Sequence, residues 1–339
     1  MRLLVTGGCG FLGSHFIRRL LRVKADSAIV NADCLTYAGS IDNLEEAAGD
    51  RRHRHANVDI ADSAAVDRLL NEKPFDLIVH FAAETHVDRS LEDAGQFVRT
   101  NVLGTQTLLA SLQRVAERSG TPPPLVVISS DEVYGPMPLG KSSGPSSPLH
   151  PTSPYAASKA AADLMALAYA RSYGLDVTVL RSVNVYGPRQ YPEKLIPLFV
   201  TRALAGETLP LYGDGLQRRC WLYVDDFVDG LIRLIENPGQ RRQHTVWHLG
   251  SEYELENREI AAMLCGLCGA DAKLITPVPD RPGHDQRYAL DFSQTTGLLG
   301  WIPRTKPLEG LRETVDWITS NQSWCRRRVG WTPAFLRER

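Results

Sequence analysis

Near its N-terminus the chain reads Thr6-Gly7-Gly8-Cys9-Gly10-Phe11-Leu12-Gly13, with glycines at positions 7, 10 and 13. The stretch follows a short apolar strand pattern, Leu3–Val5, and precedes a helix pattern, Gly13–Val23. Glycines at this spacing permit a tight turn and a close approach of the backbone to a pyrophosphate. The helix N-terminus then supplies N–H groups and the positive end of its dipole. The stretch therefore predicts a dinucleotide-binding loop.

A carboxylate after the next strand indicates which dinucleotide binds. Asp33 follows the strand pattern Ala28–Asn31, roughly twenty residues beyond the glycines, as expected of such loops. Its carboxylate can accept hydrogen bonds from the adenosine ribose hydroxyls and would repel a 2′-phosphate. NAD is therefore favoured over NADP. A structural turn followed by a chance Asp is the alternative interpretation.

Strand patterns alternate with helix patterns through the first two-thirds of the chain. The expected strands are Leu3–Val5, Ala28–Asn31, Leu77–His80, Leu125–Ser129 and Val177–Arg181, and the expected helices include Gly13–Val23, Ser63–Asn71, Val98–Arg118 and Tyr155–Tyr173. Continuous apolar strands between helices predict the α/β class, with a Rossmann-type doubly wound parallel sheet covered on both faces.

After about residue 185 prolines and glycines interrupt the pattern, and a helix pattern returns at Val224–Asn237. We expect an NAD-binding domain over residues 1–185, with later segments returning to it. A smaller mixed α/β substrate-binding region should span residues 186–325, and a solvated tail residues 326–339. The loop-like stretch Pro136–Pro148 is either a lid or a passive surface loop.

Bulk properties exclude several classes of partner. The net charge is -1 and the pI about 6.8, which argues against nucleic acid and anionic membranes. No apolar run reaches the roughly 18 residues that span a bilayer, and the N-terminus runs directly into a strand, unlike a signal peptide. Six scattered cysteines favour a reducing, cytoplasmic setting. Cys265 and Cys268 lack a second ligand pair, so no metal is expected.

The chemistry is indicated by Ser130-Asp131-Glu132, which follow an apolar run that reads as a buried strand. Two adjacent carboxylates there are costly unless something uses or pairs them. Tyr155 and Lys159 come later, spaced for one helix face. A nearby cation lowers the pKa of a tyrosine, so that a phenolate removes a hydroxyl proton while NAD accepts a hydride. On an ordinary helix, Tyr155 and Lys159 at this spacing would indicate no function. The glycine loop and Ser130 favour the catalytic interpretation.

These motifs resemble the extended short-chain dehydrogenase/reductase superfamily and, within it, the nucleotide-sugar 4,6-dehydratases, closest to those acting on dTDP-glucose. The resemblance runs from residue 1 to about residue 320. It rests on Asp33-x-Leu35-Thr36-Tyr37-Ala38-Gly39, His80-Phe81-Ala82-Ala83-Glu84-Thr85-His86-Val87-Asp88-Arg89-Ser90, Asp131-Glu132-Val133-Tyr134-Gly135, Ser153-Pro154-Tyr155-Ala156-Ala157-Ser158-Lys159, Pro192-Glu193-Lys194-Leu195-Ile196-Pro197, Tyr212-Gly213-Asp214-Gly215 and Arg281-Pro282-Gly283-His284-Asp285. Epimerases of the superfamily lack the adjacent Asp-Glu pair.

The resemblance implies roles for five catalytic residues. Tyr155, with Lys159, deprotonates the sugar O4 as NAD takes the C4 hydride. Glu132 then removes the C5 proton and Asp131 protonates the departing C6 hydroxyl, because base and acid are needed on neighbouring carbons. The hydride returns to C6, giving a 4-keto-6-deoxy sugar. Ser130, where the family usually has Thr, should hydrogen-bond near O4.

The resemblance also implies two binding sets. The cofactor-binding residues are expected to be Gly7, Gly10, Phe11, Leu12, Gly13, Asp33, Leu35, Thr36, Asp59, Ile60, Phe81, Ala82, Ala83, Thr100, Tyr155, Lys159 and Val185. The residues that hold the nucleotide-diphospho-sugar are expected to be Thr85, Ser130, Asn184, Lys194, Leu195, Arg219, Asn257, Arg281 and Asp285. Helix capping is the alternative for Asp59 and Thr100, and a surface salt bridge is the alternative for the charged substrate-binding residues.

The chain departs from the family at Cys34, Val183, Val185 and Cys220, which replace polar or acidic residues. These changes leave three functions open: the dehydratase, an epimerase or decarboxylase on the same scaffold, and a catalytically impaired NAD-binding sensor. Relatives form homodimers through two helices each, which here are Val98–Arg118 and Tyr155–Tyr173. Leu108, Leu109, Leu112, Leu164 and Leu167 on them serve either that face or the sheet.

Overall fold

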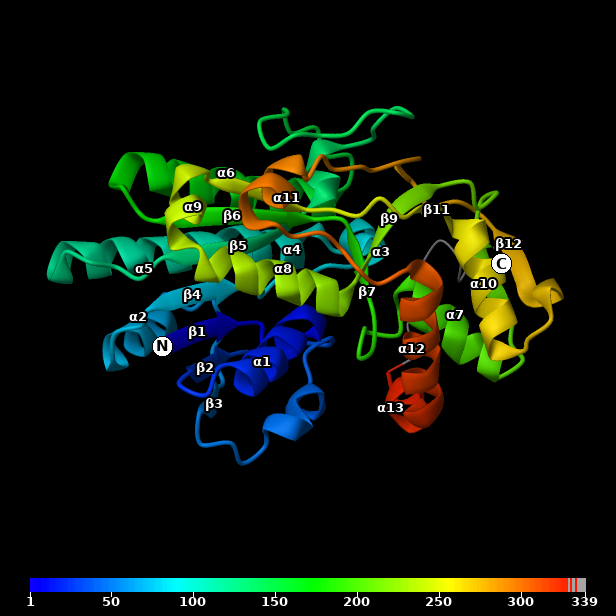
Figure 1. Cartoon of the computed structure of the whole chain (residues 1–339), viewed down its shortest axis with the longest axis horizontal. Helices are drawn as coiled ribbons and strands as arrows, with labels where there is room; N and C mark the ends of the chain where they lie inside the picture. The colour runs from blue at the N-terminus through cyan, green and yellow to red at the C-terminus, as the bar shows by residue number, and fades with distance from the viewer. Residues whose placement is uncertain (329, 331–332, 334–339) are drawn as a thin grey trace.

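The computed structural model describes residues 1–328, 330 and 333. Its main layer is a seven-stranded parallel sheet in the order β10-β6-β5-β4-β1-β2-β3 (Figure 1). The strands are β1 (Arg2–Thr6), β2 (Ala28–Ala32), β3 (His53–Ala56), β4 (Leu77–His80), β5 (Leu125–Ser130), β6 (Val177–Ser182) and β10 (Val246–Leu249). The predicted α/β doubly wound sheet is confirmed.

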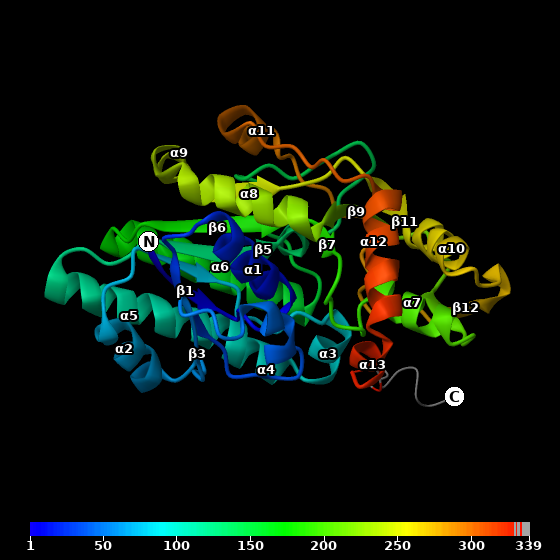
Figure 2. The same cartoon turned by 60° about the horizontal axis from the view of Figure 1, so that its bottom comes forward.

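Helices cover both faces of this sheet, and each face has its own apolar core (Figure 2). On one face lie α1 (Phe11–Val23), α8 (Val224–Glu236), α9 (Pro238–Gln243) and α11 (Ser293–Leu299); on the other lie α2 (Ser63–Glu72), α5 (Gly104–Ser119) and α6 (Pro154–Tyr173). Phe16 and Leu231 belong to the first core, and Leu69, Leu109 and Ala166 to the second. The strands buried on both sides are largely apolar for this reason, although β6 also carries the buried Thr178 and Arg181.

The chain after residue 185 builds a second region and also returns to the sheet. Its strands are β7 (Asn184–Tyr186), β9 (Arg218–Tyr223) and β11 (Glu254–Glu256) in one small sheet, with β8 (Leu209–Tyr212) and β12 (Ile275–Val278) in another. Around them pack α7 (Leu195–Leu204), α10 (Asn257–Cys268), α12 (Pro307–Ser320) and α13 (Gln322–Arg326) over a separate apolar core. The boundary near residue 185 stays a prediction.

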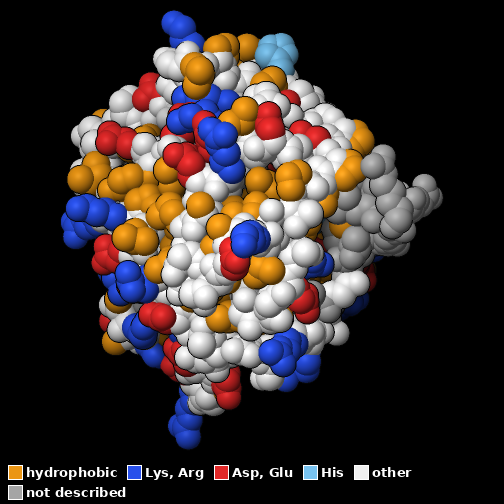
Figure 3. Space-filling view, turned by 90° about the vertical axis from the view of Figure 1, so that its right-hand side faces the viewer, with side chains coloured by type: hydrophobic (Ala, Val, Ile, Leu, Met, Phe, Trp, Pro, Cys, Tyr) orange, Lys and Arg blue, Asp and Glu red, His pale blue; other side chains and the backbone are white. Residues whose placement is uncertain are grey.

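The face of the molecule that this second region forms carries charges of both signs among apolar side chains (Figure 3). This mixture agrees with a net charge of -1 and gives no field of a single sign there. No helix among the described residues has the length and apolar character needed to cross a membrane. The tail predicted for residues 326–339 lies largely outside the described residues, although Arg328 pairs with Asp42 at 2.8 Å.

The stretch Pro136–Pro148 is held in place by the chain that follows β12. Arg287 donates from Nη1 to the carbonyls of Pro138 and Lys141, each at 2.6 Å. The N–H of Ser143 donates to the Ala289 carbonyl at 2.9 Å. Arg287 is itself fixed by Glu254 of β11 at 2.8 Å. These contacts favour the passive loop over the lid.

Candidate active site

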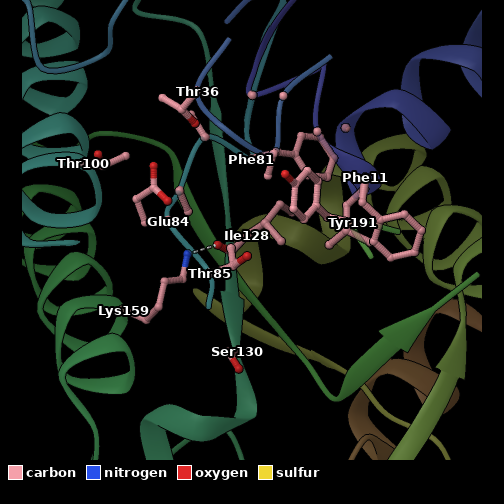
Figure 4. A pocket seen from close by; sticks show the side chains of 18 of the residues that line it. Phe11, Thr36, Phe81, Glu84, Thr85, Thr100, Ile128, Ser130, Lys159 and Tyr191 are labelled. Atoms are coloured by element: carbon pink, nitrogen blue, oxygen red, sulfur yellow. Dashed lines mark hydrogen bonds between the residues drawn. The ribbon is translucent and has the colours of Figure 1, made fainter. Parts of the chain in front are cut away.

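One cavity of about 320 Å³ opens at the carboxyl ends of the parallel strands, where α/β sheets bind their ligands (Figure 4). It brings together all five predicted catalytic residues. It also brings together every predicted cofactor-binding residue except Leu35. Of the predicted substrate-binding residues it is lined by Thr85, Ser130, Asn184 and Lys194. Leu195, Arg219, Asn257, Arg281 and Asp285 lie outside its lining.

The glycine loop leaves no room for a side chain at Gly7 or at Gly13. Gly7 has a φ of 68°, and a Cβ there would lie 2.5 Å from the backbone nitrogen of Ala82. A Cβ at Gly13 would lie 2.5 Å from the Gly7 carbonyl oxygen. The first contact sets β1 tightly against the segment after β4, and the second sets α1 tightly against the turn. The backbone is thereby left bare toward the cavity, which suits a pyrophosphate.

Asp33, directly after β2, is held by hydrogen bonds from two backbone N–H groups. Its Oδ2 accepts from the Cys9 N–H and its Oδ1 from the Leu35 N–H, both at 2.8 Å. Leu35 adopts a φ of 54°, which turns the chain back toward the carboxylate. Burial raises the pKa of Asp33 and the two backbone bonds oppose the rise. A buried, oriented carboxylate in the cavity wall fits recognition of ribose hydroxyls.

The capping alternatives do not describe Asp59 and Thr100. Helix α2 is capped by Asp62, whose Oδ1 accepts from the Ala65 N–H at 3.0 Å, so that role is taken. Asp59 instead pairs with Arg99 at 2.6 Å at the cavity wall. Thr100 lies inside a π-helical turn, Val98–Leu103, directly before α5. From this turn Thr100 lines the cavity. Such turns are rare and frequent at functional sites.

The acidic pair forms the start of a short 3₁₀ helix, Asp131–Tyr134, directly after β5. Ser130 caps it: its Oγ accepts from the Glu132 N–H at 3.3 Å and donates to Asp131 Oδ1 at 3.2 Å. Burial, then the charge of Glu132, raises the pKa of Asp131 to about 7. Among the described residues Asp131 Oδ2 and Glu132 Oε2 have no hydrogen-bond partner although both are buried. Two carboxyl oxygens are thus available to a ligand.

Tyr155 and Lys159 sit one turn apart on α6, which Ser153 caps and Pro154 begins. Lys159 donates from Nζ to the Ile128 carbonyl at 2.6 Å, as Figure 4 shows. Burial, then the charge of Glu132, raises the pKa of Tyr155, and the neighbouring Ser130 hydroxyl opposes the rise. The expectation that Lys159 lowers the pKa of Tyr155 stays a prediction. The lysine is engaged by the backbone of β5.

A basic group adjoins Glu132 beyond the cavity. Arg219 on β9 is buried, donates from Nη2 to the Asp285 carbonyl at 3.0 Å, and stacks on the Tyr288 ring at 4.5 Å. The surface-salt-bridge alternative therefore fails for it. Tyr288 in turn donates to Asp285 Oδ2 at 2.6 Å. Burial lowers the pKa of Arg219 and the charge of Glu132 opposes this, which places the acid and the guanidinium within electrostatic reach.

The remaining predicted substrate-binding residues lie on other segments of the second region. Lys194 is half-buried and donates to the Thr85 carbonyl at 2.6 Å. Arg281 reaches Asp88 at 3.5 Å. Asn257 and Leu195 begin α10 and α7. Of the departures from the family, Cys34, Val183 and Val185 line the cavity, and Cys220 is buried outside its lining.

Sequence reasoning missed several residues that line the cavity. Glu193 accepts from Tyr37 and from Arg89 Nε, both at 2.7 Å, and so ties the loop after β2 to the start of α7. Glu84 is buried, and burial raises its pKa. Both lie inside stretches that carried the family resemblance. Their partners come from distant parts of the chain, so no local signal assigned them a role.

The fold and this site together define the extended short-chain dehydrogenase/reductase class. The family model described as GDP-mannose 4,6 dehydratase matches residues 4–314. The dTDP-glucose 4,6-dehydratase of Streptomyces niveus is 47% identical over 328 residues, which cover 96% of this chain and 94% of that protein. The chain therefore belongs to the dTDP-glucose 4,6-dehydratase family, as its motifs predicted.

Two solved structures show how far the likeness extends. A crystal structure of DesIV (dTDP-glucose 4,6-dehydratase) from Streptomyces venezuelae, with NAD bound, is 48% identical, covers 96% of this chain and 98% of its own, and has a TM-score of 0.89. A UDP-glucose 4-epimerase of Thermus thermophilus in complex with NAD is 31% identical over 94% of this chain and 99% of its own, with a TM-score of 0.84. The epimerase shares the scaffold, so the activity must be argued from the site.

Asp131→Asn is expected to raise the free energy of unfolding at pH 8 by roughly 2–4 kcal/mol, at about 1.4 kcal/mol per pKa unit. The folded wild type holds its Asp131 proton up to about pH 7, whereas the unfolded chain releases it near pH ~4. The wild type therefore loses stability as pH rises between these values, and the variant does not.

Urea unfolding from pH 4 to 8 measures this difference, which should disappear at the acid end. Asp316→Asn, at an exposed position of α12, is the matched control. Equal stability of Asp131→Asn and the wild type at pH 8 would contradict the assigned environment of Asp131.

Proposed function

We propose that the chain binds NAD and converts a nucleotide-diphospho-glucose, dTDP-glucose, to the 4-keto-6-deoxy sugar by oxidation at C4, loss of water across C5 and C6, and reduction at C6. One observation carries the proposal: the adjacent carboxyl groups of Asp131, which is buried, and Glu132, which is partly buried, share a cavity with Tyr155 and Lys159. A hydride transfer alone needs no second acid and base. Elimination needs both, on neighbouring carbons.

The residues present fit NAD. The bare turn at Gly7 and Gly13 admits a pyrophosphate, and the oriented carboxylate of Asp33 suits an unphosphorylated ribose. Phe81, Ala82 and Ala83 offer a low wall along the cavity. When bound, NAD supplies the acceptor for the C4 hydride and returns that hydride to C6. The cofactor-binding set predicted from the sequence, Leu35 included through its N–H to Asp33, is retained in the proposal.

The proton steps follow from the environments of the side chains. Tyr155 is assigned the proton of the sugar O4; because burial raises the pKa of Tyr155, this step relies on nearby positive charge, which Lys159 and the nicotinamide of bound NAD would supply. The C4 ketone acidifies the C5 hydrogen, which Glu132 removes. Asp131, whose pKa is raised to about 7, still holds a proton near neutrality and gives it to the departing C6 hydroxyl. Asp131 can act as the acid because burial and the charge of Glu132 keep the proton on it, which leaves Glu132 as the base of the pair.

The diphosphate of the substrate is assigned to the basic group beside Glu132. Arg219 bears a buried charge held by backbone carbonyls and an aromatic ring, and Lys194 and Arg281 are further cations of the same predicted set. A planar guanidinium can donate to two phosphate oxygens at once. Asn184 and Asn257 are assigned with these cations to the nucleotide diphosphate and its base or ribose, with Asp285 nearby, and Thr85 and Leu195 complete the predicted substrate-binding set.

Purified protein incubated with dTDP-glucose and a catalytic amount of NAD should yield a product lighter by one water, with no net NADH. Mass spectrometry and absorbance at 340 nm measure these two quantities. A product that retains the C6 oxygen would favour an epimerase or decarboxylase. Bound NAD without any turnover, with dTDP-glucose or other hexose nucleotides, would favour the sensor.

Glu132→Gln should lower dehydration by roughly 10²–10⁴-fold, because the base for C5 is lost while oxidation at C4 can still occur. Tyr155→Phe should stop the reaction earlier, before any NADH forms. Single-turnover absorbance separates the two, since Glu132→Gln retains an NADH signal and Tyr155→Phe has none. Full turnover by either variant would refute its assigned role.

We also propose a cytoplasmic homodimer that pairs through α5 and α6. Leu108, Leu109 and Leu112 cover the sheet and are unavailable, whereas Val98, Leu103 and Leu164 are about half exposed, at 55%, 46% and 57%. Exposed apolar side chains on adjoining helices suit a second copy of the chain.

Leu164→Arg should convert a dimer to a monomer in sedimentation velocity, with Leu139→Arg in the loop after β5 as control. A monomeric wild type would contradict the proposal, and recovery in the membrane pellet of fractionated cells would contradict the location.

A further inference from the structure

One helical turn beyond Lys159, α6 carries a charge that the reaction as proposed does not use. Asp163 has no exposed side-chain surface, and its Oδ2 accepts from Arg181 Nε of β6 at 2.8 Å. Arg181 is only 2% exposed. Burying a carboxylate and a guanidinium together costs much of what their attraction returns, so such pairs are weak evidence for a purely stabilising role.

Hydrogen bonds fix Arg181 from its other side with a defined polarity. Arg181 Nη1 donates to the Tyr134 hydroxyl. The Asp291 carbonyl can only accept, so His248 donates to it from Nδ1 at 2.7 Å. His248 Nε2 is then the acceptor for Tyr134, also at 2.7 Å. The guanidinium therefore cannot turn away from Asp163 without breaking this chain of bonds.

We propose that Asp163 is a positioning residue for the reaction: its negative charge keeps the buried Lys159 side chain in the ammonium form, and Arg181 keeps Asp163 ionised. The inference rests on the proposed function, in which Lys159 holds the nicotinamide ribose beside Tyr155. Residues four apart lie on one helix face. The spacing of Lys159 and Asp163 therefore places the charges one above the other along α6.

The groups around Lys159 support this assignment. Its hydrogen bond to the Ile128 carbonyl is to a neutral acceptor. Burial lowers the pKa of Lys159, and the charge of Asp163 opposes that effect. His80, which faces it from β4, is neutral because burial and the lysine charge lower its pKa to about 3.

The other charged groups near this network act on other partners. Arg181 pairs with Asp163, the charge of Asp163 also reaches Tyr134, and the charges of Glu132, Asp131 and Asp163 raise the pKa of Tyr155. Among the described residues Asp163 is thus the group that offsets the burial of Lys159.

The test follows the protonation of Lys159 directly. The chain has seven lysines, at 24, 73, 141, 159, 194, 273 and 306, so ¹³C labelling at the ε carbon gives a sparse spectrum, and Lys159→Gln assigns its signal. The titration midpoint is measured in the wild type, in Asp163→Asn, in the double variant Asp163→Asn/Arg181→Gln, and in Tyr134→Phe. The double variant removes both buried charges, so it remains informative where Asp163→Asn alone does not fold.

Asp163→Asn and the double variant are each expected to lower the midpoint of Lys159 by about one pH unit or more. The alkaline limb of kcat should move down with it. Tyr134→Phe removes the hydroxyl that joins Arg181 to His248, so it should lower the Tm and leave the midpoint in place. An unchanged midpoint in the folded Asp163 variants would overturn the proposal. The titration needs no substrate, so absent turnover of dTDP-glucose by the wild type would count against the proposed function alone.

Discussion

All seven strands of the main sheet run in one direction, and this constraint organises the site. The carboxyl ends of β1, β2, β4, β5 and β6 meet at a single edge, and the loops that follow them supply Gly7, Asp33, Ala82, Asp131 and Val183 to one cavity. The closeness of Gly7 to Ala82 depends on β1 and β4 being neighbours in the sheet. Catalytic groups separated by tens of residues therefore share a wall without any long loop to bring them together.

The same edge gathers charge in a place with little water. Asp131, Lys159 and Asp163 are nearly or wholly buried, and burial is the largest influence on the pKa of each. In such surroundings a carboxyl group stays protonated and an ammonium loses its proton more easily. Acid chemistry at neutral pH becomes available to Asp131 for that reason, and Lys159 needs a compensating charge. The folded state is accordingly less stable than an apolar site would make it.

Much of this architecture could be predicted from the sequence because its signals are local. The strand Leu77–His80 was placed to the residue, and the helix patterns at α1, α2, α6 and α8 differ from the structure by at most two residues at either end. The glycine loop and Asp131-Glu132 identify the site because each motif is contiguous. Strand β10 is not predicted from the sequence because Val246–Leu249 is only a short apolar run. Its place beside β6 depends on contacts across the fold.

The features that sequence reasoning missed share a physical reason. Glu193 acts with Tyr37 and Arg89, which lie more than a hundred residues away. The pKa of Tyr155 depends on burial and on the charge of Glu132, which spacing along a helix does not determine. The family motif identifies Arg219 as a binding residue. Its contacts with the Asp285 carbonyl and the Tyr288 ring could not be predicted, because they form only in the folded chain. Local patterns predict elements, whereas tertiary contacts decide the protonation of the groups on them.

The return of the chain to the first sheet also affects synthesis on the ribosome. The core beneath α1 includes Leu231, Trp247 and Trp301, so the first 185 residues cannot cover that face by themselves. At roughly 5–20 residues per second, about ten seconds pass between the emergence of β6 and that of Trp301. During this interval β6 is an edge strand for as long as its partner β10 has not been made. The nascent protein therefore passes through a stage in which its half-finished nucleotide fold is a natural client for a chaperone.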